Sequence, residues 1–328
     1  MPDYVLAADI GGTNVRVARV SSTGRISHHK RVLTPPAGGV AVVDALATLL
    51  EQIPRTGVGA IGVDVPGLAY NNGDVWAPNI RGWKRMPLGV RLQERLHLPV
   101  VVESDRNAFV VGEAWKGTTR NCRNVVFLAV GTGIGAGILA DGRLLRGHGE
   151  LAGSVGWMAV RDRYLPQYAK TGCLESHAAG PGIGLAARRL LRRNISAPEV
   201  ARLAAQGDRR AQLILERAGH YLGLALANLV STLNPEMIVV GGGVAEEGGL
   251  LLKTARETMM RWAQPIAVRQ VRLVRSELGD AASLLGVAKL ALDATRNSGH
   301  TLFENAAVSS QHVDFRRRRK STVGGSPA

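Results

Sequence analysis

Residues 5–20 read VLAADIGGTNVRVARV, and residues 126–140 read VFLAVGTGIGAGILA. Each segment is an apolar run rich in strand formers, followed by a turn of glycine and threonine and then a second apolar run. This pattern predicts a strand, a glycine loop and a returning strand in each half of the chain. The duplication indicates two lobes that face one phosphate-bearing ligand.

Length and composition place the chain among ordinary globular proteins. Its 328 residues favour two domains, and 45% hydrophobic with 20% charged residues is a normal balance for a packed core. No apolar run is long and continuous enough to cross a bilayer. The first strand is expected within the first few residues, with no basic and apolar leader before it. We therefore expect a cytoplasmic protein with no membrane partner.

The positive charge is concentrated in part at the C-terminal end. The net charge is +15, and residues 316–320 read RRRRK. Residues 298–328 lose periodicity and are rich in serine, glycine and arginine, so we expect a disordered, solvated tail. Nucleic-acid binding by this tail is the less favoured alternative, and an aromatic content of 4% argues against a stacking platform for single strands.

The first glycine loop carries chemistry suited to phosphate and metal. Asp9 ends the predicted strand, and a carboxylate there can hold Mg²⁺ through water. The glycines let backbone amides approach phosphate oxygens, and Thr13 supplies a hydroxyl. No Gly-Lys-Ser/Thr opens a helix and a strand follows the loop, which excludes a Walker loop and a dinucleotide fingerprint. The loop alone could be a plain hairpin turn, but its second copy favours phosphate binding.

Three glycine clusters make up the predicted nucleotide site. The third cluster ends a buried strand at residues 241–243, a place where open α/β sheets bind ligands, and we expect adenosine there. The predicted ATP- and phosphate-binding residues are Gly11, Gly12, Thr13, Asn14, Gly131, Thr132, Gly133, Gly135, Gly242 and Gly243.

Asp105 is the predicted catalytic carboxylate. It follows the predicted strand 100–102 and precedes a predicted helix. A hydroxyl that attacks phosphorus needs an acceptor for its proton, and a carboxylate within hydrogen-bond reach can serve. A helix N-cap is an equally weighted interpretation, for which Ser104 or Asp105 is suited.

Together these motifs resemble the ROK family (repressor, open reading frame, kinase) of the actin-like ATPase and sugar kinase superfamily, which includes bacterial glucokinases. The resemblance covers about residues 4–290. It rests on residues 9–13, 66–67, 78–79, 103–107, 112–115, 131–137, 172–175 and 241–243. It implies an α/β fold of two actin-like, ribonuclease H-like lobes with mixed sheets flanked by helices. The expected lobes are residues 1–112 and 113–297, with nucleotide and sugar in the cleft between them.

The resemblance also implies an activity. It implies ATP with Mg²⁺ and a hexose or amino-sugar substrate, phosphorylated at the hydroxyl on carbon six, in a homodimeric enzyme. Asp105 matches the family's general base, and Glu175 matches a carboxylate that binds sugar hydroxyls. The residues expected to bind the sugar are Gly67, Asn79, Ser104, Asp105, Ser154, Trp157 and Glu175.

Several positions depart from the family pattern. Ser104 replaces the asparagine of Asn-Asp-x-Asn, and Ser154 and Trp157 replace the glutamate and histidine of Gly-Glu-x-Gly-His. A shift in register would let Glu150 replace that glutamate, although the pattern around Trp157 fits better without it. Cys173 alone remains of the zinc loop, and one cysteine cannot hold a structural zinc, so we expect none.

These departures leave other functions open. One alternative is a catalytically weakened, sugar-binding regulatory protein of the same family that lacks an N-terminal helix-turn-helix. A less favoured alternative is an actin-like chaperone or filament ATPase, which the sugar-site residues argue against. Trp157 either stacks on a sugar or packs the loop that holds zinc in relatives.

Overall fold

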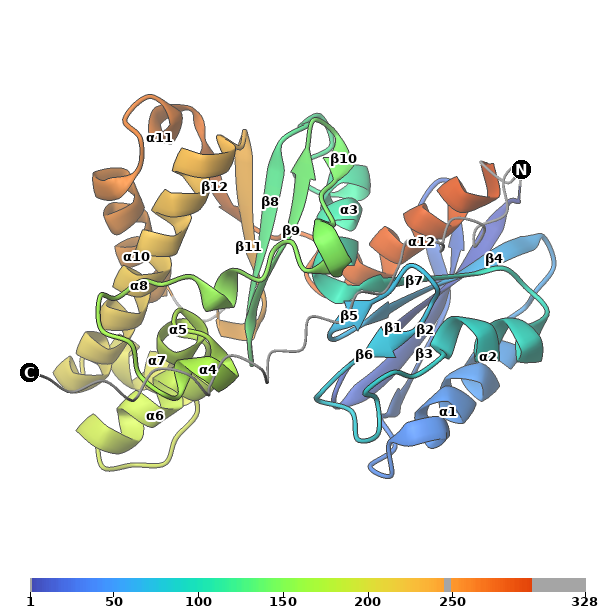
Figure 1. Ribbon diagram of the computed structural model, residues 1–328, viewed down its shortest axis with the longest axis horizontal. Coiled ribbons are helices and arrows are strands. Elements are labelled where there is room, and N and C mark those ends of the chain that lie inside the picture. The colour runs from blue at the N-terminus through green and yellow to red at the C-terminus, as the bar shows by residue number, and fades with distance from the viewer. Residues whose placement is uncertain (1, 245–248, 297–328) are drawn as a thin grey trace, which may run out of the picture.

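Two five-stranded mixed sheets lie within residues 2–244 and 249–296, the part of the chain described by this computed structural model (Figure 1). The strands of the first sheet are β1 Tyr4–Ile10, β2 Asn14–Ser21, β3 Ile26–Leu33, β4 Val58–Val65 and β7 Val100–Ser104. The strands of the second sheet are β8 Val125–Val130, β9 Ile134–Ala140, β10 Arg143–Leu144, β11 Met237–Gly241 and β12 Arg272–Arg275. A small separate hairpin consists of β5 Leu68–Ala69 and β6 Val75–Trp76.

The two sheets repeat one topology. Their strand orders are β3-β2-β1-β4-β7 and β10-β9-β8-β11-β12. β1 pairs antiparallel with β2 and parallel with β4, and β8 pairs antiparallel with β9 and parallel with β11. The hairpin predicted in each half is therefore present, and the predicted fold of two mixed sheets flanked by helices is confirmed.

Helices cover both faces of the first sheet. On one face lie α1 (Gly39–Glu51) and α2 (Leu88–Leu96), and Leu6 and Ala8 of β1 belong to the core beneath them. Alternate residues of a strand point to opposite faces, so Val5 and Ala7 face the other way. There they pack with α12 (Ala281–Arg296) in a separate core cluster. The last described helix thus returns to the sheet formed by the start of the chain.

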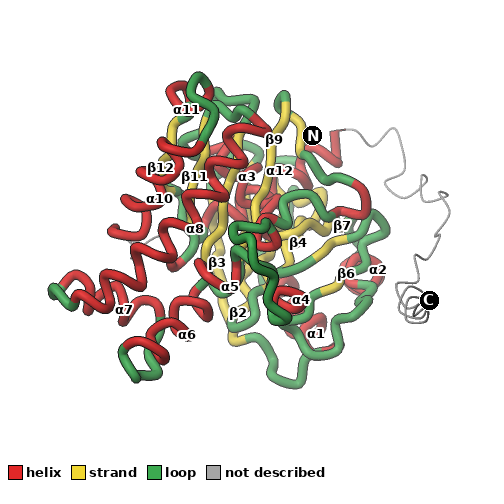
Figure 2. Tube along the Cα trace, turned by 60° about the vertical axis from the view of Figure 1, so that its left-hand side comes forward, coloured by secondary structure: helices red, strands yellow, loops and turns green. Residues whose placement is uncertain are grey.

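The second sheet is covered by longer helices. Buried side chains of α8 (Arg209–Leu233) and α10 (Gly249–Trp262) share one core with the strand residues Ile238 and Val240. Figure 2 shows α6 and α7 at the edge of the molecule, below α8. The shorter helices are α4 Tyr168–Thr171, α5 Glu175–Ala178, α6 Gly180–Leu190, α7 Ala197–Ala205 and α11 Ala267–Gln270. No helix of the described residues is long and apolar enough to span a membrane.

The lobe limits at residues 112 and 297 stay a prediction. The expected disordered tail, residues 298–328, lies outside the described residues.

Helix α3 (Asp105–Lys116) makes close backbone contacts with α12, the helix that packs on the first sheet. A Cβ atom at Gly112 would lie 1.9 Å from the carbonyl oxygen of Ala282, and one at Gly286 would lie 1.8 Å from that of Ala108. Only glycine allows the two helices to approach this closely. Since α3 begins at Asp105, this contact also fixes the position of the predicted catalytic residue.

We expect Gly286→Ala to lower the free energy of unfolding by about 1–3 kcal/mol, because the added methyl group must push the α3 backbone away. Urea unfolding followed by circular dichroism measures the change. Gly249→Ala is the matched control, because Gly249 is an exposed helical glycine with open space where its Cβ would be. An equal effect of the two substitutions would contradict the close contact between α3 and α12.

Candidate active site

Asp105 lies at the start of α3, directly after β7 of the first sheet. Its Oδ1 accepts a hydrogen bond from the backbone N–H of Arg106 at 2.7 Å. The hydroxyl of Ser104 lies 3.5 Å from the same oxygen and donates to the carbonyl of Gly67 at 2.8 Å. The three predicted residues Gly67, Ser104 and Asp105 are thus together. Burial, helped by the negative charge of Asp9, raises the pKa of Asp105 to about 6 although the Arg106 N–H opposes the shift.

The N-cap interpretation of this segment is only partly met. Ser104 occupies the N-cap position of α3, but its side chain makes no capping hydrogen bond. Instead Glu103 Oε1 accepts hydrogen bonds from the backbone N–H of Ser104 and from Nδ2 of Asn107, each at 2.9 Å. Glu103 therefore stabilises the start of α3, and the carboxylate of Asp105 is left with one backbone donor.

A second carboxyl group, not found by sequence reasoning, stands beside Asp9. The parallel register of β1 and β4 pairs Asp9 with Asp64, which is completely buried. Neither oxygen of Asp64 accepts a hydrogen bond within the part of the chain that the structure describes. Burial and the charge of Asp9 hold the pKa of Asp64 well above its usual range. A neutral Asp64 can then donate its proton to Asp9. The available signal was an aspartate within the apolar run 58–65.

Asp9 is also tied to an arginine. Arg16 Nε donates to Asp9 Oδ2 at 2.7 Å, and Arg16 Nη1 donates to Asp280 Oδ2 at 2.6 Å. Asp280 immediately precedes α12, so this guanidinium links the first hairpin to the loop before the last helix. The position of Asp9 at the end of β1 is therefore fixed by charge on one side and by Asp64 on the other.

The two glycine loops are both tight hairpin turns closed by a backbone hydrogen bond. The N–H of Gly11 donates to Asn14 O at 2.8 Å, and the N–H of Gly131 donates to Gly133 O at 3.0 Å. Space is open where Cβ atoms of Gly12 and Gly131 would lie. These loops therefore offer backbone that a phosphate can approach.

A cavity of about 740 Å³ lies against the second loop. Gly131, Thr132 and Gly243 line it together with residues of α6 and α7. The predicted second loop and third glycine cluster thus meet at one cavity, whereas residues 11–14 do not line it. Gly242 adopts φ of 92°, and a Cβ there would lie 2.6 Å from Val130 O. The cavity is large enough for a nucleotide.

Gly133 and Gly135 lie against side chains rather than in this cavity. A Cβ atom at Gly133 would lie 2.8 Å from Glu175 Oε2, and one at Gly135 would lie 3.5 Å from Cδ of Arg106. Glu175 Oε2 accepts a hydrogen bond from the backbone N–H of Ile134 at 2.7 Å. Burial raises the pKa of Glu175. The predicted sugar-binding carboxylate therefore rests directly on the second glycine loop.

The remaining predicted sugar residues are more dispersed. Ser154 donates its hydroxyl hydrogen to Leu151 O at 2.7 Å, which leaves its oxygen as an acceptor. Trp157 is 55% exposed, so its indole does not fill the core of the loop. Asn79 is exposed in a turn of the first lobe. In residues 2–244 and 249–296 no hydrogen bond joins these three to Asp105, and their roles stay predictions.

An ion pair that sequence reasoning missed connects β7 of the first sheet to the loop after β10 of the second. Glu103 is the penultimate residue of β7 and is 4% exposed, and its Oε2 accepts from Arg146 Nη2 at 2.8 Å and from Nε at 3.2 Å. Arg146 follows β10, and it also approaches Glu150 Oε2 at 3.5 Å. Arg106 Nη2 in turn donates to Glu150 O at 2.9 Å. Arginines from both sides thus join α3 to the loop that carries Ser154.

Glu150 itself lies in a strained and buried position. Its φ is 63°, in the left-handed region that costs a non-glycine residue about 1 kcal/mol or more. Burial raises its pKa, while Arg146 and Arg106 oppose the shift. Glu150, Glu103, Arg146 and Asn71 line a cavity of about 160 Å³. Glu150, the residue that could replace the family's sugar-binding glutamate if the sequence register is shifted, is therefore held by Arg146.

The protein alone offers too few ligands for Mg²⁺, so the ion would be held partly by Asp9 and partly by the phosphates of the nucleotide. Within the described ranges no group of three or more His, Cys, Asp or Glu side chains is placed to hold a metal ion. Mg²⁺ commonly keeps its waters and takes one or two carboxylates plus substrate phosphates. Asp9 fits this role, because both Arg16 contacts use its Oδ2 and leave its Oδ1 without an arginine partner. The expectation of no zinc stays a prediction.

Comparison with known proteins agrees with this architecture. The sequence model of the ROK family matches residues 5–294, so the chain belongs to that family. A glucokinase of Halalkalibacterium halodurans is 31% identical over 312 residues, covering 86% of this chain and 93% of the relative. An N-acetyl-D-glucosamine kinase of Salmonella paratyphi B is 31% identical over 298 residues, covering 87% and 98%. A crystallised ROK family glucokinase from Streptomyces griseus, in complex with glucose and AMPPNP, is 30% identical with a TM-score of 0.75, covering 88% and 99%.

We expect Arg146→Met to lower the free energy of unfolding by about 1–2 kcal/mol, because buried Glu103 loses its cation while solvent screens the half-exposed guanidinium. Chemical unfolding measures the loss. Arg143→Met is the matched control, an exposed arginine three positions earlier. Adding Glu103→Gln to Arg146→Met should recover part of the loss in a double-mutant cycle. Additive effects would contradict the ion pair.

Proposed function

We propose that the protein transfers the γ-phosphate of ATP to a hydroxyl group of a hexose or amino sugar, with the hydroxyl on carbon six as the acceptor. The observation that carries this proposal is Asp105, a half-buried carboxylate with a pKa of about 6 at the start of α3. Two relatives at 31% identity are a glucokinase and an N-acetyl-D-glucosamine kinase, which supports this class of substrate.

In the proposed reaction Asp105 accepts the proton of the sugar hydroxyl as its oxygen attacks the γ-phosphorus. The new O–P bond forms as the bond to the β-γ bridging oxygen breaks, and ADP leaves with that electron pair. A pKa near 6 suits the residue because it is a carboxylate at neutral pH yet basic enough to take a proton in the transition state. Its single backbone donor holds Oδ1 in place.

The phosphates would lie on the glycine loops. The backbone is open to a ligand at Gly12 and Gly131, and Gly131 and Thr132 line the large cavity. Asp9 would hold Mg²⁺ through water, and the ion would neutralise charge on the β- and γ-phosphate oxygens. Arg16 and Asp64 keep Asp9 at the end of β1 for this role.

The sugar would lie between Asp105 and Glu175. Glu175, Asn79 and the Gly67 segment would orient its hydroxyls, with Trp157 at the exposed side. Ser104 and Ser154 both donate their hydroxyl hydrogens to carbonyl groups of the protein. They can therefore only accept from a sugar hydroxyl, whereas the asparagine usual at position 104 in the family would also donate. A site that distinguishes hydroxyl patterns in this way changes which sugar is accepted more than it changes the reaction.

We expect ATP turnover that depends on sugar when the protein is assayed with MgATP against a panel of hexoses and amino sugars. A coupled assay for ADP measures it. Sugar binding without turnover by any member of the panel would instead favour the regulatory alternative. ATP turnover that no sugar stimulates would favour the chaperone or filament class.

We expect Asp105→Asn to lower kcat by about 10²–10⁴-fold, because the amide cannot accept the proton. In the wild type kcat/KM should fall with decreasing pH with an apparent pKa of about 6, since the protonated carboxyl is inactive. Stopped-time assays between about pH 5 and 8 measure both. Near-normal turnover of a folded Asp105→Asn variant would contradict the role of the residue.

We expect Asp105→Asn, which lowers turnover, to raise the stability of the fold at high pH. The pKa of Asp105 is about 6 in the folded protein and 3.8 in the reference state, so the folded state binds the proton more tightly. This contribution to stability is fully present below about pH 4 and is lost as pH rises through about 6. Asp105→Asn should therefore raise Tm near pH 8 but not near pH 4, which thermal melting checks together with the intact fold.

A further inference from the structure

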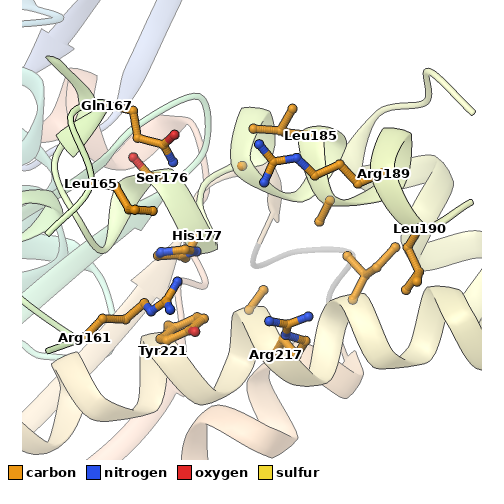
Figure 3. Close-up of a pocket in the computed structure, with 14 residues that line it drawn as sticks. Arg161, Leu165, Gln167, Ser176, His177, Leu185, Arg189, Leu190, Arg217 and Tyr221 are labelled. Atoms are coloured by element: carbon orange, nitrogen blue, oxygen red, sulfur yellow. The ribbon is translucent and has the colours of Figure 1, made fainter. Parts of the chain in front are cut away.

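A cavity of about 280 Å³ lies in the second lobe, between α5, α6 and α8 (Figure 3). It is separate from the cavity at the phosphate loop, although both include Leu185 of α6. Gln167 precedes α4, and Ser176 and His177 belong to α5, which begins with Glu175. None of the roles proposed above uses this cavity.

Its charge is entirely positive. Arg161, Arg189 and Arg217 line it from three different segments, and Figure 3 shows them on three sides of the space. No aspartate or glutamate is among its fourteen lining residues. Across residues 2–244 and 249–296, none of these three arginines forms an ion pair with a carboxylate. The positive charge is therefore not compensated by the protein itself.

This positive charge also acts on His177, whose imidazole lines the same cavity. The pKa of His177 is lowered by burial and by the nearby charges of Arg161, Arg217 and Arg189. A neutral His177 holds Tyr168 through a hydrogen bond of 2.6 Å between Nε2 and the phenol oxygen. The imidazole of His177 is therefore an uncharged part of the cavity wall. The positive charge of the cavity comes from the three guanidinium groups.

The remaining wall is apolar and aromatic. Leu165, Leu190 and Ile214 contribute aliphatic side chains. The rings of His177 and Tyr221 lie 4.5 Å apart with their planes tilted by 30°. Such a wall suits the carbon face of a ring better than a fully hydrated ion. The volume admits one small molecule and excludes a nucleic-acid strand.

We propose that this cavity binds a small phosphorylated metabolite that carries a ring. Its phosphate group would lie among Arg161, Arg189 and Arg217, because guanidinium groups match phosphate oxygens in geometry and charge. Its ring would rest against Tyr221 and the leucines. Two kinds of ligand could supply this phosphate group, a sugar phosphate and an inorganic diphosphate. The experiment below distinguishes them.

Isothermal titration calorimetry of the full chain tests this site. The probes are hexose 6-phosphate, pyrophosphate and the unphosphorylated hexose, each titrated into the wild type and into Arg189→Gln/Arg217→Gln, because binding in the cleft is common to both proteins. We expect the double variant to lose heat with hexose 6-phosphate and to keep the wild-type heat with the unphosphorylated hexose. Tighter binding of pyrophosphate than of hexose 6-phosphate would overturn the role given to the ring.

Arg189→Gln/Arg217→Gln should weaken this binding at least tenfold, because two charged donors to phosphate are lost. The matched control is Arg193→Gln/Arg210→Gln, which removes two exposed arginines of the same lobe that do not line the cavity. All four positions are exposed, so both variants should keep the wild-type Tm. Equal binding by both double variants would overturn the proposal.

Absence of any heat with hexose 6-phosphate and pyrophosphate would also overturn it. Sedimentation tests whether a second copy of this chain covers the cavity instead. If no anion binds and only Arg189→Gln/Arg217→Gln changes the oligomeric state, the cavity is an interface between copies of this chain and the proposal is overturned. Failure of the sugar kinase proposal would leave this comparison intact, because it depends on the arginines of the cavity and not on binding in the cleft.

Discussion

Helix α3 is held between the two sheets by contacts in which backbone touches backbone. Gly112 and Gly286 let α3 and α12 meet at the first sheet, and a Cβ atom at Gly137 of β9 would lie 2.0 Å from Arg106 O. These contacts leave little room for α3 to shift relative to either sheet. Because the helix begins at Asp105, the packing that joins the lobes also places the proposed base. The position of this carboxylate thus depends on three glycines.

The parts of the fold that follow from local pattern could be predicted from the sequence. The two hairpins were visible because apolar runs and glycine turns are local signals, and Asp105 was visible because it follows a strand and opens a helix. The fold and the family membership are confirmed. The contact of Asp9 with Asp64 was missed, because it depends on the register between strands that are distant in the chain. Arg146 was missed for the same reason, since its partner Glu103 lies in β7, the edge strand of the other sheet.

The departures from the family pattern are accommodated within the protein rather than left as gaps. Ser104 donates to Gly67, Ser154 donates to Leu151, and the strained Glu150 lies between two arginines. A buried polar group without a partner costs about 1–3 kcal/mol, so this internal pairing explains how the site tolerates the substitutions. Under the proposed function, a sugar would meet hydrogen-bond acceptors at these two serines. The identity of the sugar would therefore depend on them, while the glycine loops and Asp105 would serve the transfer itself.

The most direct test of this account is phosphorus NMR of the product formed from MgATP and an accepted hexose. The account predicts a new phosphomonoester signal coupled to the two protons on carbon six, and no such signal with the corresponding 6-deoxy sugar. A phosphomonoester formed equally well from the 6-deoxy sugar would contradict the proposed acceptor. Release of inorganic phosphate alone, with or without sugar, would contradict the proposal that the protein is a sugar kinase.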